Sequence, residues 1–179
     1  MFGSQGWSEA QPLEGSQNDN PPQRGGGEPK TMPSTYTQLL YHLVLSTKDR
    51  RPLITEDMEP SLYAYRGGII RSEKGVLLAA GGMPDHLHLL VRYCADAKLS
   101  DLLRTLKSRS SKWIHDEYTT DFSWQVGYAA FTVSQSGVPE VKKYIGNQKV
   151  HHKKRDFKVE LITMLKLHEI EYDERYVFD

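Results

Sequence analysis

Two histidines stand one residue apart in an apolar segment, residues 83–91, that reads Met-Pro-Asp-His-Leu-His-Leu-Leu-Val. Side chains alternate between the two faces of a β-strand, so His86 and His88 share one face while Leu87 and Leu89 point to the other. Neutral imidazole is the commonest protein ligand of divalent metals. The pair therefore indicates a metal site on a strand. Ordinary surface or core histidines are the alternative until further ligands are found.

A tyrosine and a glutamine further along the chain supply candidate partners. Residues 141–148, Val-Lys-Lys-Tyr-Ile-Gly-Asn-Gln, are expected to be helical because residues 136–140 are typical of a helix start. Residues four apart on a helix lie on one face, so Tyr144 and Gln148 can face the same target. A tyrosine, with its pKa of about 10, is a poor nucleophile at neutral pH. It can attack a target that a metal ion polarises, although a helical tyrosine taken alone more often serves packing.

These residues resemble the motifs of the single-tyrosine HUH transposases, the insertion-sequence-200-like family (insertion sequence 200/605). Residues 84–90 match the HUH motif, in which two histidines flank a hydrophobic residue, and residues 144–148 match the tyrosine helix of that group. The resemblance extends over residues 32–179. Further landmarks of the family are residues 36–38, 106–108, 151–155 and 170–176.

The resemblance implies an activity and a set of partners. Tyr144 would be the nucleophile that attacks single-stranded DNA, leaving a 5′-phosphotyrosine intermediate and a free 3′-hydroxyl. His86, His88 and Gln148 would be the metal ligands, and a mixed nitrogen and amide-oxygen set suits Mg²⁺ or Mn²⁺. Members of the family recognise DNA hairpins and act as homodimers, in which the tyrosine helix of one subunit completes the histidine site of the other. Gly146, inside the expected helix, is interpreted as permitting a close approach or helix mobility.

The order of the expected elements predicts an α+β fold. Strand, helix, strand, strand, helix and strand in succession are typical of a ferredoxin-like (RRM-like) antiparallel sheet with helices on one face, to which C-terminal helices are added. The first helix is expected to begin at Thr55 and the second to be capped by Ser100. The strands are expected at residues 36–46, 76–82, 86–93 and 128–133, and the last helix at 157–169.

Two basic stretches are candidate DNA contacts. Arg104, Lys107, Ser108 and Ser111 follow one another at helical spacing on the exposed side of the second expected helix, a face that can follow phosphates. Lys153, Lys154 and Arg155 belong to the densest basic run of the chain, directly after the tyrosine helix. A solvated basic face is the alternative for both stretches.

Length and composition predict one globular domain, residues 34–179, after an N-terminal extension, and the resemblance implies that this is the transposase domain. Of the 179 residues, 38% are hydrophobic and 26% are charged, as in ordinary globular proteins. Residues 1–33 are rich in Gly, Pro, Ser, Gln and Asn and are expected to be disordered, with residues 1–31 dispensable or the product of a misplaced start codon. The single cysteine, Cys94, the lack of a secretory signal and the lack of a long apolar run fit a cytoplasmic protein. A formal net charge of zero is a mild argument against nucleic-acid binding, which the distribution of charge can override.

Two other functions fit the same residues. A ferredoxin-like domain can bind single-stranded nucleic acid without catalysis, although this chain lacks the paired aromatic strand motif that RNA-recognition modules use for stacking. A domesticated relative could instead cleave repeat hairpins for its host without moving an element. Terminal hairpins around the gene would favour the mobile element.

Overall fold

A four-stranded antiparallel sheet organises the chain. Its strands are β1 (Leu39–Ser46), β2 (Val76–Met83), β3 (His86–Tyr93) and β4 (Ala129–Thr132), and their order in the sheet is β2-β3-β1-β4. Most residues of the two central strands, β3 and β1, are buried, as expected of strands that are covered on both faces. The ferredoxin-like fold predicted from the sequence is confirmed.

The computed structural model describes residues 36–151, 156–173, 175 and 177. The expected N-terminal extension, residues 1–33, lies outside this part of the chain, as do Lys153, Lys154 and Arg155. Within the described residues, no helix combines the length and the apolar character that crossing a bilayer requires.

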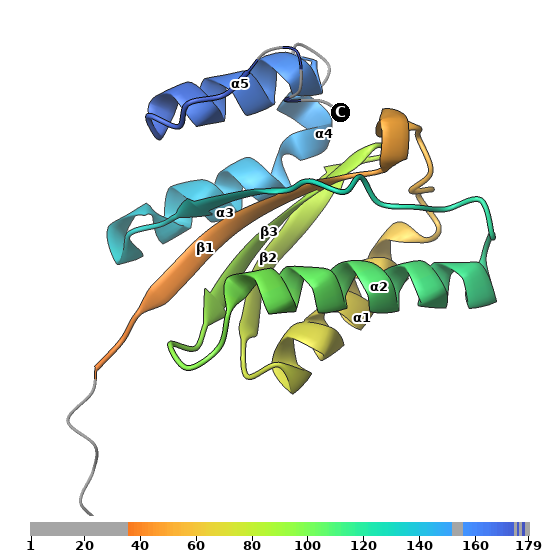
Figure 1. Cartoon of the computed structure of the whole chain (residues 1–179), viewed down its shortest axis with the longest axis horizontal. Helices are drawn as coiled ribbons and strands as arrows, with labels where there is room; N and C mark the ends of the chain where they lie inside the picture. The colour runs from red at the N-terminus through yellow and green to blue at the C-terminus, as the bar shows by residue number, and fades with distance from the viewer. Residues whose placement is uncertain (1–35, 152–155, 174, 176, 178–179) are drawn as a thin grey trace, which may run out of the picture. The chain divides into compact units, whose positions relative to one another are not determined.

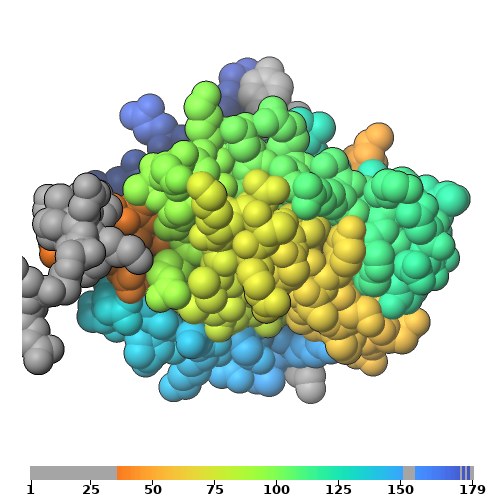
Figure 2. All heavy atoms as spheres, turned by 90° about the horizontal axis from the view of Figure 1, so that it is seen from below, coloured from red at the N-terminus to blue at the C-terminus, as the bar shows by residue number. Residues whose placement is uncertain are grey.

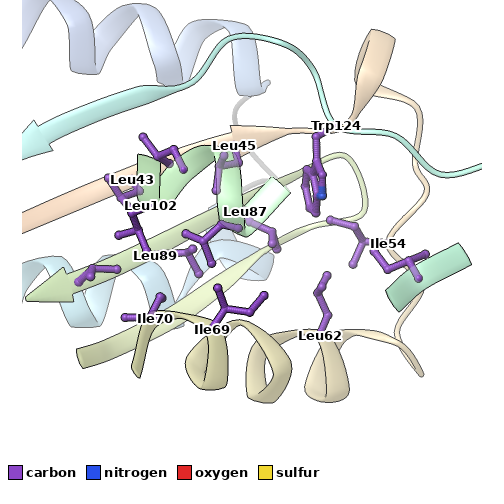
Figure 3. Packing of buried hydrophobic residues seen from close by; sticks show 14 of the residues in the cluster. Leu43, Leu45, Ile54, Leu62, Ile69, Ile70, Leu87, Leu89, Leu102 and Trp124 are labelled. Carbon is purple, nitrogen blue, oxygen red and sulfur yellow. The ribbon is translucent and has the colours of Figure 1, made fainter. Parts of the chain in front are cut away.

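Two long helices, α1 (Glu59–Ser72) and α2 (Leu99–Glu117), cover one face of the sheet (Figure 1). Figure 2 looks at the molecule from this side and shows the two helices next to each other. Leucines from the central strands and apolar residues from both helices form the main core between them (Figure 3). Members of this core include Leu43, Leu45, Leu87, Leu89, Leu62, Ile69, Ile70 and Leu102.

The ends of these two helices differ from the sequence prediction. Thr55 does not begin the first helix, which starts at Glu59 with a proline in its first turn. Ser100 does not cap the second helix, because the residue at the N-cap is Lys98 and no side chain caps that end. A short 3₁₀ turn, η1 (Lys48–Arg50), lies between β1 and α1.

The C-terminal helices lie on the opposite face of the sheet (Figure 1). They are α3 (Val138–Gly146), α4 (Gln148–His151) and α5 (Phe157–Leu167), and the 3₁₀ turn η2 (Gln135–Gly137) precedes them. A second, smaller apolar cluster fixes α5 to the sheet through Phe157 and Leu165, which pack with Val44 and Phe131. Helices therefore cover both faces, and the expected single helix over 141–148 is in fact two, separated at Asn147.

A glycine in β2 lets the tyrosine helix approach the sheet. A Cβ atom at Gly81 would lie 2.3 Å from the backbone carbonyl oxygen of Ile145 in α3, so only glycine fits this contact without displacing the helix. Gly81 pairs with His88 on the neighbouring strand. At Gly146, by contrast, an added Cβ would meet nothing within 4 Å. Gly146 is therefore not the point of close approach, a role that Gly81 has, and the alternative that Gly146 gives the helix mobility stays a prediction.

Candidate metal centre and tyrosine site

His86 and His88 lie side by side on the face of β3 that the C-terminal helices cover. Both are fully buried, with 0% of their surface exposed, and their ring centroids are 5.2 Å apart. Leu87 and Leu89 between and after them enter the main core on the other side of the sheet. The shared face predicted from strand alternation is therefore confirmed, and the two histidines are not surface residues.

A neighbouring side chain contacts the Nδ1 atom of each histidine ring. Nδ1 of His86 lies 2.7 Å from an oxygen of Asp85, and Nδ1 of His88 lies 2.9 Å from Nε2 of His42. Burial, with a smaller effect from His88, lowers the pKa of His42 to about 3, so this ring is neutral at physiological pH. Such contacts at one ring nitrogen orient a histidine and leave the other nitrogen for a metal.

The tyrosine of α3 lies against this histidine pair within the same chain. The ring centroid of Tyr144 is 5.7 Å from that of His88 and 6.0 Å from that of His42, both in edge-on contacts. The hydroxyl of Tyr144 donates a hydrogen bond to Oε1 of Glu160 in α5. Gln148, the first residue of α4, donates from Nε2 to the same oxygen at 3.0 Å. Although the helix breaks between them, Tyr144 and Gln148 reach one target.

That target, Glu160, is the site residue that the sequence motifs did not reveal. It is 7% exposed, and its two carboxylate oxygens lie 3.6 Å from Nε2 of His86 and 3.6 Å from Nε2 of His88. Burial raises the pKa of Glu160 to about 7, against a smaller opposing effect of His86. The signal in the sequence is that Glu160 stands between Phe157 and Leu161, inside the apolar stripe of its helix, where a carboxylate is uncommon.

These buried side chains fit a divalent cation. One ligand atom each from His86, His88 and Glu160 lie within 4.8 Å of one another. Gln148 is 1% exposed, and its Oε1 has no hydrogen-bond partner among the residues that the structure describes. Two imidazole nitrogens, a carboxylate and an amide oxygen form a donor set suited to ions such as Mg²⁺ and Mn²⁺.

The candidate DNA contacts on α2 line an open groove of about 440 Å³ together with Tyr128. The ammonium group of Lys107 forms hydrogen bonds within the protein, because it donates to the backbone carbonyls of Gln125 and Val126, each at 2.7 Å. Arg104 forms an exposed ion pair with Asp101. The structure thus brings Arg104, Lys107, Ser108 and Ser111 together at one surface, and their contact with DNA stays a prediction.

Comparison with known proteins decides the family. A family model described as "Transposase IS200 like" matches residues 35–148, more than half of the chain. The chain belongs to this transposase family. As a member of this family, the protein is a DNA-cleaving enzyme that acts in DNA recombination. The family is metal-dependent.

One individual transposase and two solved structures are also similar to this transposase. The ISDra2 transposase TnpA of Deinococcus radiodurans is 25% identical over 118 residues, which are 62% of this chain and 84% of the relative. A crystal structure assigned as a transposase from the same organism is similar with a TM-score of 0.55 and 25% identity, over 66% of this chain and 97% of the other. A REP-associated tyrosine transposase bound to a REP hairpin shares the fold, with a TM-score of 0.52 and 16% identity over 69% of this chain and 74% of that one.

The family match covers only part of the site. It includes both histidines, Tyr144 and Gln148, and it ends at residue 148. Helix α5 and its Glu160 lie beyond the matched segment, which explains why the family motifs give no indication of this carboxylate.

Proposed function

We propose that this transposase cleaves and rejoins single-stranded DNA through a 5′-phosphotyrosine bond to Tyr144, with a divalent ion, Mg²⁺ or Mn²⁺, held by His86, His88 and Gln148. The observation that carries the proposal is the position of the Tyr144 ring, 5.7 Å from the His88 ring inside one chain. A nucleophile must lie within reach of the group that polarises its target. The fold alone, which many functions share, would not support this conclusion.

Each residue has a part in the proposed reaction. The Tyr144 hydroxyl gives up its proton as its oxygen forms a bond to phosphorus. The bond from phosphorus to the 3′-oxygen of the preceding nucleotide breaks, and that oxygen takes up a proton to become a 3′-hydroxyl. The hydrogen bond to Glu160 orients the phenol. Asp85 and His42 fix the two imidazole rings. When bound, the ion supplies positive charge that stabilises the developing charge on the phosphate oxygens.

The exchange conserves the phosphoester bond. Because the phosphotyrosine keeps the energy of the cleaved linkage, a second 3′-hydroxyl can attack it, reform the DNA and release Tyr144. Rejoining therefore needs no nucleotide cofactor. The chain has no P-loop sequence of the form Gly-x-x-x-x-Gly-Lys-Ser/Thr, in keeping with this scheme.

DNA hairpins are the proposed substrate feature. The solved REP-associated transposase is bound to a REP hairpin, and by this likeness the present transposase recognises terminal hairpins of an insertion sequence. A host role in processing repeat hairpins is the second candidate, favoured by the same neighbour. The DNA sequences on the two flanks of the gene distinguish the two candidate roles, because hairpins at both ends indicate a mobile element.

The proposed assembly is a homodimer, and the family resemblance implies that its subunits share active sites, which differs from the arrangement within one chain that carries the proposed chemistry. Mixing a Tyr144→Phe chain with a His86→Ala chain tests this sharing, because one intact site would then form across the dimer. Restored cleavage supports shared sites. A mixture without activity instead supports a site complete within one chain, the arrangement in which Tyr144 and His88 are seen here.

The direct test is formation of a covalent conjugate. Protein and a labelled single strand from a gene flank are incubated with Mn²⁺, and the products are separated under denaturing conditions. The wild type should give a conjugate that EDTA prevents, while Tyr144→Phe should give none and keep its fold. Tyr118→Phe is the matched control, since Tyr118 is a partly exposed residue at the end of α2. A normal conjugate yield from Tyr144→Phe would refute the proposal.

A further inference from the structure

We infer that the carboxylate of Glu160 is a direct ligand of the divalent ion, so that helix α5 supplies a charged member of the metal site beside His86, His88 and Gln148. The inference rests on the proposed function, because it concerns the ion of the same site. It adds a ligand from outside the segment that the family model matches.

The first support is the spacing of the facing atoms. Each carboxylate oxygen lies 3.6 Å from an imidazole Nε2, which is longer than a hydrogen bond between nitrogen and oxygen, about 2.7–3.2 Å. Two ligand atoms that each lie about 2.1 Å from one ion are about 3.0–3.4 Å apart, depending on the angle between them. The two separations between Glu160 and the histidines need to close by only a few tenths of an ångström to fit a shared ion.

The second support is the polarity of those atoms. The contact with Asp85 favours a proton on Nδ1 of His86, which leaves a lone pair on Nε2 directed at Glu160. Nδ1 of His88 lies within hydrogen-bond distance of Nε2 of His42, and when Nδ1 is the donor, Nε2 of His88 likewise faces Glu160 without a proton. A cation between these atoms would be attracted by the two imidazole nitrogens and by the carboxylate.

The third support is that α5 is held in place by contacts of its own. Phe157, at the start of the helix, stacks on the His86 ring with centroids 4.3 Å apart. His168, directly after the helix, stacks on Phe131 of β4 at 4.5 Å. Gln148 then donates to Oε1 of Glu160 and orients the carboxylate. Packing therefore presents Glu160 to the histidines, as a preorganised ligand requires.

The ligand would change what the site does in two ways. A carboxylate lowers the net charge of the ion and its protein ligands from +2 to +1 and strengthens binding of hard cations such as Mg²⁺ and Mn²⁺. Oε1 of Glu160 also accepts the hydrogen bond from the Tyr144 hydroxyl, so the nucleophile is hydrogen-bonded to a ligand of the ion. The position of Tyr144 should consequently depend on Glu160.

Metal binding to the full-length protein tests the inference without reference to activity. Mn²⁺ titrations by calorimetry and by electron paramagnetic resonance compare the wild type with Glu160→Gln, which keeps the shape and removes the charge. Glu171→Gln is the matched control, because it makes the same change at an exposed residue after α5. We expect Glu160→Gln to weaken Mn²⁺ binding by at least about 10-fold and Glu171→Gln to leave it unchanged. Equal affinity for all three proteins would overturn the inference.

A second variant keeps the test decisive if Glu160→Gln folds poorly. A thiolate prefers soft cations, so Glu160→Cys should raise the affinity for Cd²⁺ relative to Mn²⁺ by about 10-fold or more if residue 160 touches the ion. A carboxylate that only supports the packing of α5 would give no such change in preference, and an unchanged ratio counts against direct ligation.

The two proposals fail in different ways. If the wild type forms the DNA conjugate and Glu160→Gln binds Mn²⁺ as tightly as the wild type does, the ligand role of Glu160 is wrong and the tyrosine chemistry stands. If Glu160→Gln loses Mn²⁺ affinity while the wild type forms no conjugate, the ligand role stands and the proposed reaction is wrong.

Discussion

Replacing Gly81 by alanine should disturb the position of Tyr144 without touching any residue of the proposed chemistry. The new Cβ would lie 2.3 Å from the carbonyl oxygen and 3.1 Å from the carbonyl carbon of Ile145. Ile145 is the neighbour of Tyr144 in α3. Because the position of Cβ is fixed by the backbone of β2 and the atom that it meets is a backbone carbonyl, no side-chain rotation relieves the contact, and the helix must move away from β2 by about 1 Å to restore an ordinary contact.

The magnitude follows from that displacement. Overpacking of this kind costs about 1–3 kcal/mol of folding free energy, and a shift of about 1 Å in a reacting group can lower a rate by about 100-fold. We therefore expect Gly81→Ala to remain folded, with a lower free energy of unfolding and a rate of conjugate formation about two orders of magnitude below the wild type.

The assay combines single-turnover conjugate formation with urea unfolding. Gly146→Ala is the matched control, since it adds the same methyl group at the end of α3 where nothing lies within 4 Å. It should keep the rate of the wild type and lose none of its stability, since alanine is the better helix former. If Gly81→Ala formed the conjugate at the wild-type rate, the argument that this close approach sets the position of Tyr144 would fail.

Three further predictions follow from the contacts around the site. His42→Leu should weaken Mn²⁺ binding by about 10–100-fold, because the ring of His88 loses its partner; calorimetry with an unchanged affinity would contradict this. In EDTA, the raised pKa of Glu160, about 7 against the usual 4.5, should make the wild type lose about 2–3 kcal/mol of stability relative to Glu160→Gln as pH rises from about 5 to 8. The carboxyl group of Glu160 keeps its proton to a higher pH in the folded state than in the unfolded state, so its contribution to stability is full at low pH and is lost as the pH rises through the folded pKa. The lowered pKa of His42 changes the stability in the opposite direction, and this effect cancels because both proteins contain His42. Lys107→Met should lower the free energy of unfolding by about 1–3 kcal/mol, because backbone carbonyls of the segment before β4 lose their donor, and an unchanged urea midpoint would show that these bonds contribute nothing.

The local part of the site was predictable because local geometry determines it. Strand alternation places His86 and His88 on one face whatever the rest of the fold does. The apolar run of β1 likewise predicts a central strand, and β1 lies inside the sheet with most of its residues buried. Spacing also brought Tyr144 and Gln148 to a common target, even though the helix expected to carry both ends at Gly146.

The remaining parts depend on tertiary packing that no short motif encodes. Glu160 approaches the histidines only because Phe157 and Leu165 fix α5 against the sheet, and neither contact follows from the spacing of residues. His42 on β1 contacts His88 on the neighbouring strand β3, so its role in orienting His88 depends on the register between these two strands. Lys107, expected to face phosphates, instead holds backbone carbonyls of a segment that follows its helix.

The central claim is that the Tyr144 oxygen becomes covalently joined to DNA, and locating the bond tests it most directly. After reaction with single-stranded DNA, digestion with nuclease and trypsin should yield the peptide of residues 144–149, Tyr-Ile-Gly-Asn-Gln-Lys, carrying a nucleotide through its 5′-phosphate. Tandem mass spectrometry should place the added mass on Tyr144. A nucleotide on another residue, or DNA cut with no peptide modified, would contradict the account.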